Sequence, residues 1–361
     1  MCRNKEGEAM KKPYVIAELG VNFYDTAKVE GITPLEAAKK YIDEAKRAGI
    51  DAVKFQSYKA NTIASVHSPA YWDTTKEPTQ SQYELFTKFD GFNREEYEAL
   101  CAHCEKVGID FMSTPFDYAS ADYLEPLMKA YKISSSDLSN TPFIRHIARK
   151  GKPIYLSVGA SYLPEIEDAV RAMREEGCPE IALLHCVLSY PTKNSDANLA
   201  VIRTLKEKFP DLKIGYSDHT LPDEHMTILS TAFLYGAEII EKHFTLDKTL
   251  QGNDHYHAGD PEDFRKAIEN FELICQVSGS SEKTVLPCEE VPRREARRSL
   301  VLTRDKKAGE VLTEEDLTAK RPGTGISPCD MQAAAGCRVK TDLAEDTVLT
   351  WDMLEKKTGA Q

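Results

Sequence analysis

The chain has 361 residues, of which 41% are apolar and 29% charged, and its formal net charge is −12 at pH 7. This composition is typical of a soluble globular protein, and no apolar run reaches the ~18 residues that a membrane-spanning helix needs. The negative charge argues against nucleic acid and anionic membrane surfaces as partners. A chain of this length predicts one large domain and a smaller one.

The first residues, MCRNKEGEAMKK, lack the apolar segment of a secretory signal, so we expect a cytoplasmic protein. Nine cysteines are scattered singly along the chain, and Cys186 falls in an expected buried strand, which favours reduced thiols. Cys101 and Cys104 have a metal-like spacing on an expected helix. No second such pair completes a four-ligand zinc site.

Eight short apolar runs recur along the first three quarters of the chain. They lie at residues 15–19, 52–56, 111–114, 131–134, 153–158, 181–186, 213–217 and 239–244. Between most of them lie amphipathic patterns, such as residues 35–49, 94–108 and 197–209, several of which end in Gly or basic residues. Eight buried strands alternating with helices predict an α/β fold, the (β/α)₈ TIM barrel.

The connection at residues 57–93 is too long, and too rich in aromatic and polar residues, for a plain barrel helix. A long excursion after a barrel strand lies on the catalytic face, so we expect it to form a lid or a substrate wall. The alternative is a solvated insertion with a local aromatic cluster.

A polar segment with two prolines follows the last expected barrel helix, and short strands and turns without helical periodicity follow it. We therefore place the barrel domain at residues 1–280, a linker at 281–295 and a small second domain at 296–361. Such a small domain has little core of its own and is expected to pack on something.

Two matching apolar runs each end in a histidine, His219 in IGYSDHT (214–220) and His243 in IIEKHFT (239–245). A histidine at a strand end is commonly a hydrogen-bonded wall residue. Two on neighbouring parallel strands, ~4.8 Å apart, would instead share one ion and leave positions for water or substrate. Imidazoles with oxygen ligands suit Mn²⁺, Fe²⁺, Co²⁺ or Zn²⁺.

Almost every expected strand ends in polar side chains. They are Glu18, Asn22, Lys54, Gln56, Ser113, Thr114, Lys132, Ser134, Ser135, Ser136, Asp137, Ser157, Tyr190, Ser217, Asp218, Glu241 and His243. Buried polar side chains cost free energy unless they have partners, so this convergence predicts a ligand site.

Lys54 and Lys132 each lie between apolar neighbours that must point the other way, so both face the barrel interior. With the hydroxyls of Ser135, Ser157 and Ser217 they suit a phosphate. The alternative for each lysine alone is an ion pair with an interior carboxylate such as that of Glu18 or Glu241.

The chain contains, in order, VIAELGVN, AVKFQS, FMSTPFD, YKISSSD, IYLSVGAS, LLHCVLSYPT, GYSDHT and EKHFT. This series resembles the motifs of the sialic acid (N-acetylneuraminate) synthase family, which joins phosphoenolpyruvate to an N-acylated amino sugar. The later stretch RRSLVLTRDKKAGEVLTEEDLTAKRPGTG resembles the antifreeze-like (SAF) domain of that family. The likeness covers nearly the whole chain.

The resemblance implies a domain-swapped homodimer with a divalent ion on His219 and His243, Mn²⁺ first and Mg²⁺ or Co²⁺ as alternatives. It implies that phosphoenolpyruvate binds at Lys54, Lys132, Ser135, Ser157 and Ser217. It implies a sugar pocket at Glu18, Gln56, Tyr190 and Asp254, to which we add Asn22 and Thr114. Arg321 would reach the sugar's N-acyl group from the partner's small domain.

The chain also departs from the family pattern. Phe23 replaces a histidine beside Asn22, and Leu188 replaces an asparagine that contacts phosphate in some members. The segment GNDHYHAGD adds His255 and His257, which we expect to be solvent-exposed loop histidines, with substrate or metal contact as the alternative.

The expected activity is a metal-dependent condensation of phosphoenolpyruvate with an N-acylated hexosamine such as N-acetylmannosamine, releasing phosphate. Lys54 and Lys132 would orient the attack, and Glu18, Asp137 or Glu241 would manage protons. The alternatives are a legionaminic or pseudaminic acid synthase, another phosphoenolpyruvate-dependent 3-deoxy-keto-acid synthase, or an inactive carbohydrate-binding relative.

Overall fold

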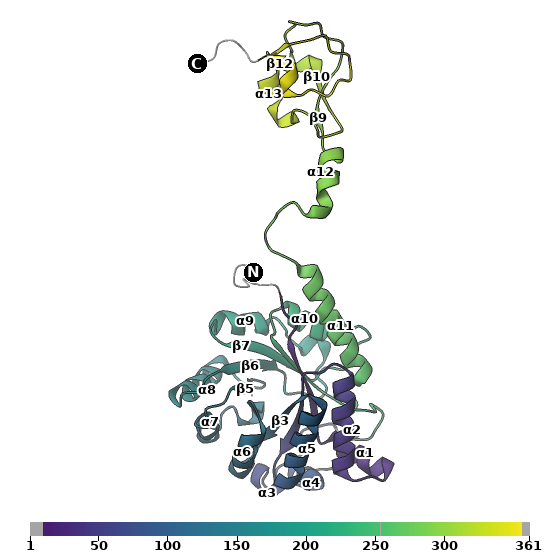
Figure 1. Ribbon diagram of the computed structural model, residues 1–361. Coiled ribbons are helices and arrows are strands. Elements are labelled where there is room, and N and C mark those ends of the chain that lie inside the picture. Colours follow the sequence, from purple (N-terminus) through teal and green to yellow (C-terminus); the bar gives the residue numbers. More distant parts are fainter. Residues whose placement is uncertain (1–9, 253, 356–361) are drawn as a thin grey trace. The chain divides into compact units, whose positions relative to one another are not determined.

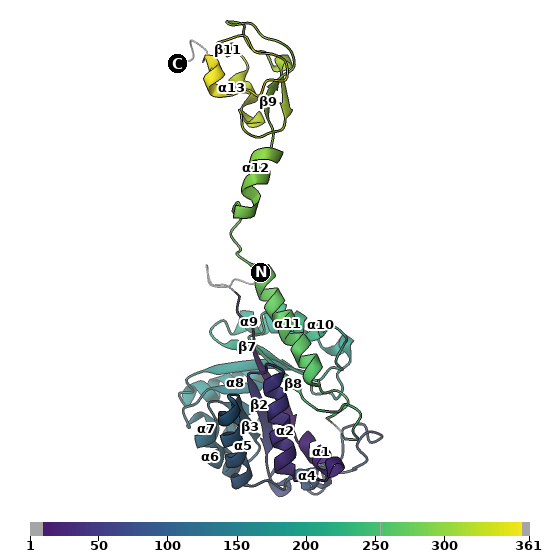
Figure 2. The same ribbon diagram turned by 45° about the vertical axis from the view of Figure 1, so that its right-hand side comes forward.

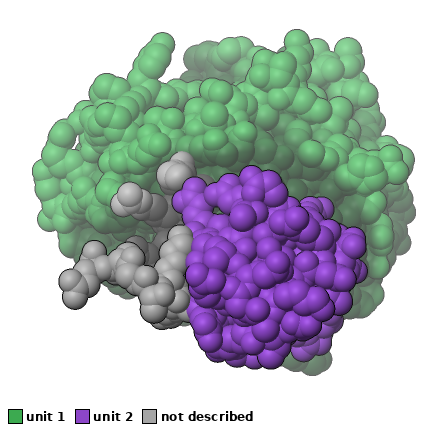
Figure 3. Space-filling view, turned by 90° about the horizontal axis from the view of Figure 1, so that it is seen from above, with its two compact units in different colours: residues 1–279 green, residues 280–361 purple. Residues whose placement is uncertain are grey.

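The computed structural model describes residues 10–252 and 254–355, and the chain divides into two compact units between Gly279 and Ser280 (Figure 3). Each unit has its own apolar core. No helix within these described ranges has both the length and the apolar character needed to span a bilayer.

The larger unit is a parallel eight-stranded barrel with helices around its outside (Figures 1 and 2). Its strands are β1 (Tyr14–Gly20), β2 (Ala52–Ser57), β3 (Asp110–Pro115), β4 (Tyr131–Ile133), β5 (Ile154–Ser157), β6 (Ile181–Cys186), β7 (Lys213–Asp218) and β8 (Ile239–His243). The sheet order is β3-β2-β1-β8-β7-β6-β5-β4, so the ladder is open only between β3 and β4. The predicted (β/α)₈ fold is confirmed.

Helices connect the strands. They are α1 (Asn22–Glu30), α2 (Pro34–Arg47), α3 (Ala60–Ile63), α4 (Gln82–Phe89), α5 (Arg94–Val107), α6 (Tyr118–Leu124), α7 (Thr141–Ala148), α8 (Leu163–Glu175), α9 (Val201–Lys208), α10 (Thr227–Leu234) and α11 (Pro261–Ser278). Helix α2 illustrates how local sequence sets a helix. Thr33 and Glu36 form a capping box at its first turn, and Tyr41 and Ala45 lie on its buried face.

The barrel interior changes from apolar to polar along the strands. Alternate residues point inward, and at the amino-terminal end these form a small apolar cluster that includes Ile16, Ala52 and Ile239. Two residues further along each of these three strands, the inward positions hold Glu18, Lys54 and Glu241. The apolar layer therefore closes one end of the barrel, and ionisable groups lie above it.

Gly215 allows strands β7 and β8 to approach closely. A Cβ atom at this position would lie 2.7 Å from the carbonyl oxygen of Ile239, closer than a real Cβ approaches backbone. The two strands that carry His219 and His243 to the barrel mouth therefore need a residue without a side chain here.

The smaller unit contains β9 (Ser299–Leu302) paired with β10 (Leu317–Lys320), β11 (Arg338–Val339) paired with β12 (Leu354–Glu355), and the short helix α13 (Met331–Ala334). Its buried apolar residues include Leu300, Leu312 and Leu349. Helix α12 (Glu290–Ala296) and the 3₁₀ turn η4 (Pro287–Glu289) precede β9, within the segment expected as a linker.

Candidate active site

Two lysines and two glutamates form a buried charge layer at the barrel mouth. Lys54 contacts Glu18, and its Nζ lies 3.8 Å from Glu241 Oε2. Lys132 donates a 3.0 Å hydrogen bond to Glu241 Oε1. All four side chains are at most 5% exposed. Both lysines face the barrel interior, as predicted. Each also forms the ion pair with an interior carboxylate that was the alternative to phosphate binding.

Burial and pairing shift the ionisation of this layer. Burial, reinforced by the neighbouring charge of Lys132, lowers the pKa of Lys54 to about 7 although Glu241 opposes the shift. Burial alone would raise the pKa of Glu241, but Lys132 and Lys54 outweigh it and lower that pKa to about 2. Glu241 is therefore a carboxylate at neutral pH, whereas the charge of Lys54 responds to small changes in its surroundings.

Hydroxyl groups surround this charge layer around a small cavity of about 60 Å³. Ser217 donates a 2.9 Å hydrogen bond to Glu241 Oε1, and Lys54 donates one of 3.1 Å to Thr114. Ser135 accepts a 2.9 Å hydrogen bond from the Gly159 amide. Ser157 Oγ is buried and has no hydrogen-bond partner among the described residues, which leaves it available to a polar ligand.

A group of side chains that could hold a metal ion adjoins this cavity. His243, Asp254 and His257 each offer one ligand atom within 4.8 Å of those of the other two. His219 lies beside them, with its ring centroid 5.5 Å from that of His243. Its Nδ1 donates a 2.8 Å hydrogen bond to the Val187 carbonyl, which leaves Nε2 as the ligand atom.

The expectation that His255 and His257 are solvent-exposed is wrong, because both side chains are 0% exposed. The loop after β8 folds back over the barrel mouth and is joined to it at the Phe244–Gly259 bridge. This bridge joins residues 15 positions apart, so the local sequence alone did not reveal that the loop returns to the strand end.

The residues at this position suit a divalent cation. Burial and the neighbouring His257 and His219 rings lower the pKa of His243 well below its ordinary value, so it is a neutral imidazole. Its Nδ1 is buried without a hydrogen-bond partner in the described part of the chain, and lies 3.8 Å from Asp254 Oδ2. Neutral imidazoles beside a carboxylate are a usual donor set for first-row divalent metals.

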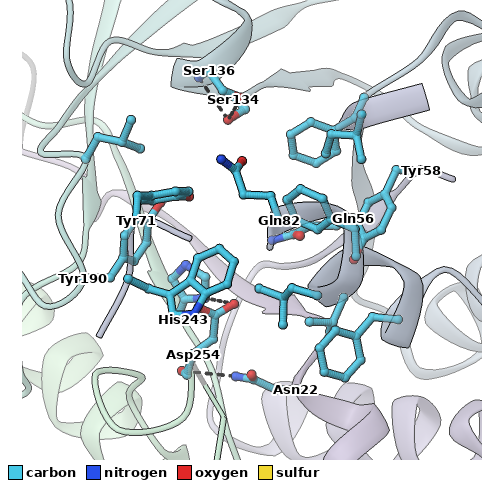
Figure 4. Close-up of a pocket in the computed structure, with 18 of the residues that line it drawn as sticks. Asn22, Gln56, Tyr58, Tyr71, Gln82, Ser134, Ser136, Tyr190, His243 and Asp254 are labelled. Carbon is cyan, nitrogen blue, oxygen red and sulfur yellow. Dashed lines mark hydrogen bonds and ion pairs between the residues drawn. The ribbon is translucent and has the colours of Figure 1, made fainter. Parts of the chain in front are cut away.

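A larger cavity of about 340 Å³ opens next to the small one (Figure 4). Six residues line both cavities: Gln56, Phe116, Ser134, Leu188, Tyr190 and His243. The remaining lining residues of the large cavity are Val21, Asn22, Asp25, Tyr58, Ile63, Tyr71, Trp72, Gln82, Leu85, Phe86, Phe89, Ser136 and Asp254. Eight of these come from the excursion at 57–93, which therefore forms a wall of this cavity and is not a solvated insertion.

Of three further predicted site residues, Asn22 and Tyr190 line a cavity and Asp137 does not. Asn22 lines the large cavity, but its amide donates to the carbonyls of Phe244 and Asp254, at 3.0 and 3.3 Å. Tyr190 packs its ring 4.1 Å from that of His219. Asp137 accepts a hydrogen bond from the side-chain amide of Asn140, which immediately precedes α7, and lines neither of the two cavities.

Phe23 and Arg321 complete the set of singled-out residues. Phe23 is buried and stacks with Phe92 at 5.1 Å, so this position contributes to the core and not to the pocket. Arg321 is exposed in the smaller unit. Gly325 lies four residues on, where a Cβ atom would fall 2.3 Å from the Leu349 carbonyl oxygen.

The sequence reasoning missed a buried ion pair behind the histidines. Lys242 donates to Asp218 Oδ2 at 2.6 Å and to the Thr220 carbonyl at 2.7 Å. Each member directly precedes one of the histidines, His219 or His243, so the pair joins the ends of β7 and β8. Lys242 lies between the inward-facing Glu241 and His243, so the alternation along a strand predicts that its side chain points out of the barrel. That alternation was the sequence signal for the ion pair.

The barrel has a lysine-lined cavity beside a cation-capable group at its mouth, an arrangement typical of a barrel enzyme. A family model described as the NeuB family matches residues 41–283, and one described as the SAF domain matches residues 297–355. The chain therefore belongs to the NeuB family of nonulosonic acid synthases, and the resemblance read from the motifs is confirmed.

Relatives across distant organisms agree with this assignment. The N,N'-diacetyllegionaminic acid synthase of Legionella pneumophila is 36% identical, over 95% of this chain and 94% of its own length. The N-acetylneuraminate-9-phosphate synthase of Drosophila melanogaster is 32% identical, over 94% and 95%. The crystal structure of the N-acetylneuraminic acid synthetase from Leptospira borgpetersenii, in complex with citrate, has a TM-score of 0.67 and 33% identity, covering 78% of this chain and 90% of its own.

Proposed function

We propose that this chain condenses phosphoenolpyruvate with the open-chain aldehyde of an N-acylated hexosamine that carries no phosphate, forming a nonulosonic acid and releasing inorganic phosphate. The observation that carries the proposal is the pairing of a buried, serine-lined two-lysine cavity with a histidine and carboxylate group at one barrel mouth. A protein that only bound sugar would need neither.

The lysines and hydroxyls position phosphoenolpyruvate. Lys132 and Lys54 attract its phosphate, and Ser135, Ser157 and Ser217 surround it with donors. The enol carbon then bonds to the aldehyde carbon, water adds at the neighbouring carbon, and the bond from that carbon to the phosphate oxygen breaks. The two lysines balance the charge of the departing phosphate.

His219, His243 and Asp254 would hold the divalent ion, Mn²⁺ first and Mg²⁺ or Co²⁺ as alternatives. Such an ion supplies Lewis-acid polarisation of the acceptor carbonyl. Of the carboxylates considered for proton transfer, Glu18 and Glu241 line the small cavity and Asp137 does not. We therefore assign proton handling to Glu18 and Glu241.

The lining of the large cavity supports an acceptor without phosphate. Among the described lining residues there are two aspartates and no lysine or arginine, whereas a buried phosphate is commonly paired with a lysine or an arginine. Aromatic residues of the excursion, including Tyr71, Trp72 and Phe86, instead offer apolar contact. A deoxygenated, doubly acylated hexosamine fits this wall best, in keeping with the product named for the Legionella relative.

We also propose that the working enzyme is a domain-swapped homodimer in which Arg321 reaches the partner's acceptor. Arg321 is exposed in the smaller unit, and the tight approach of Gly325 to Leu349 fixes the loop that follows it. An exposed arginine on a fixed loop suits recognition of an N-acyl oxygen.

We place the reaction in the cytoplasm. The eight cysteines that the structure describes are all free thiols, as expected in a reducing compartment. Cys101 and Cys104 are buried in α5, and neither belongs to the metal-capable group found among the described residues.

A phosphate-release assay tests the proposed function. The full-length chain is incubated with phosphoenolpyruvate, Mn²⁺ and an unphosphorylated N-acylated hexosamine, and the His219→Ala/His243→Ala double variant serves as the comparison. We expect acceptor-dependent phosphate release from the wild type and at least a ~1,000-fold loss in the folded variant. Retained turnover in the variant would exclude the metal role, and no release in the wild type with any acceptor would exclude the function.

A further inference from the structure

His257 is a buried histidine that the mechanism above does not use. Its side chain is 0% exposed, and it lies on the loop between β8 and α11. The ring centroids of His243 and His219 lie 4.9 and 6.2 Å from its own. The three imidazoles therefore gather at one point of the barrel mouth, beside the ring of Tyr190.

The separations of the three rings are compatible with binding to one ion. An imidazole bound at ~2.1 Å has its centroid about 3.2 Å from the metal, so two such rings lie at most about 6.4 Å apart. The observed centroid separations of 4.9, 5.5 and 6.2 Å all fall within this limit. The ligand atoms of His243, Asp254 and His257 all lie within 4.8 Å of one another, and His243 Nδ1 lies 3.8 Å from Asp254 Oδ2. Two ligands on opposite sides of one ion lie at most about 4.4 Å apart.

His255, two residues earlier, is equally buried but has a different role. One ring nitrogen lies 2.8 Å from Thr245 Oγ1 and the other lies 3.3 Å from Asp25 Oδ2. Both nitrogens are engaged in hydrogen bonds that hold the loop, and His255 is not among the metal-capable group in the described residues. The chain thus offers a matched control for His257.

We propose that His257 is a third imidazole ligand, so that this chain holds its cation with His219, His243, His257 and the carboxylate of Asp254. The inference extends the proposed function by adding a ligand to its cation site. A site with three imidazoles favours Mn²⁺, Co²⁺ or Zn²⁺ over Mg²⁺, which prefers oxygen ligands. Because three imidazoles and one carboxylate make four protein ligands, the acceptor carbonyl can bind only to an ion that takes five or six ligands.

Metal binding, measured without turnover, tests this assignment. Metal-free full-length chain is titrated with Mn²⁺, and free Mn²⁺ is followed by electron paramagnetic resonance for the wild type, His257→Gln and His255→Gln. We expect the Kd of His257→Gln to rise on the order of tenfold or more, and that of His255→Gln to change less than about twofold. Pulsed spectra should show one fewer coupled imidazole nitrogen in His257→Gln only.

A gain-of-signal variant covers the case in which His257→Gln folds poorly. Loaded with Co²⁺, His257→Cys should show the charge-transfer absorption of a cobalt–thiolate bond, and His255→Cys should not. Unchanged Mn²⁺ affinity and nitrogen coupling in His257→Gln, or no such band in folded His257→Cys, would overturn the inference. His219→Gln and His243→Gln separate the two failures, because unchanged affinity in these variants would also overturn the cation site itself.

Discussion

Lys54 is a lysine whose protonation state changes the charge of the small cavity. It faces Glu18 and Glu241 with almost no solvent contact, and burial lowers its pKa to about 7. An ordinary lysine stays charged across the neutral range, whereas Lys54 changes charge within it. The cavity therefore gains or loses one positive charge near neutral pH.

The pH dependence of phosphoenolpyruvate capture should report this group. Below about pH 7 Lys54 is protonated and attracts the anion. Above that pH the free enzyme must take up a proton on binding, so log(kcat/KM) should fall by about one per pH unit between roughly pH 7 and 9. The guanidinium of Lys54→Arg stays charged, so this limb should vanish in that variant. A flat wild-type profile would show that Lys54 does not titrate in this range.

At the scale of elements, strands β7 and β8 carry the two histidines of the proposed cation site. The Lys242–Asp218 pair joins their ends, and the missing side chain of Gly215 lets them approach. Both members of the pair are at most 2% exposed. Because each lies next to a histidine, the pair fixes the two imidazoles relative to each other.

Breaking this pair should cost stability, and removing it whole should cost activity. Lys242→Met leaves the Asp218 carboxylate buried without its cation and should lower the free energy of unfolding by about 3–5 kcal/mol. Asp218→Asn/Lys242→Met should recover most of that loss but retain a reduced kcat. Urea denaturation in a Trp351→Phe background, where Trp72 alone reports on the barrel, measures the change. A loss below about 1 kcal/mol in Lys242→Met would contradict the role given to the pair.

The elements and the inner wall of the site could be predicted because they follow local rules. Alternation along β2 and β4 placed Lys54 and Lys132 inside the barrel, and strand ends located Ser157 and His219. The long connection at 57–93 lines the large cavity at the barrel mouth, where its position after a barrel strand placed it.

The rest of the site depends on tertiary contacts that no local pattern encodes. His257 is buried because the loop after β8 returns to the strand end through the Phe244–Gly259 bridge. Asp137 had the right strand-end position, but its turn directs the carboxylate to Asn140. The alternation along β8 predicts that Lys242 points outward, but only the structure shows that it pairs with Asp218.

At the scale of the whole molecule, the proposed exchange of small domains predicts the activity of a heterodimer formed from two inactive variants. His243→Ala inactivates a barrel, and Arg321→Ala inactivates a small domain. A heterodimer of the two variants would place both defects in one site and leave the other intact, so it should have about half the wild-type activity. If Arg321 served its own barrel, both sites would be defective and the heterodimer would be inactive. Two affinity tags allow its purification for the phosphate-release assay.

The mass of the product tests most directly whether the enzyme condenses phosphoenolpyruvate with an unphosphorylated N-acylated hexosamine. Full-length chain is incubated with phosphoenolpyruvate, Mn²⁺ and an equimolar mixture of a diacetamido-trideoxyhexose, N-acetylmannosamine and N-acetylmannosamine 6-phosphate. We predict that mass spectrometry finds the nonulosonic acid of the diacetamido sugar in excess, less of that from N-acetylmannosamine, and none from the phosphorylated sugar. A phosphorylated nonulosonic acid as the main product, or no condensation product at all, would contradict the account.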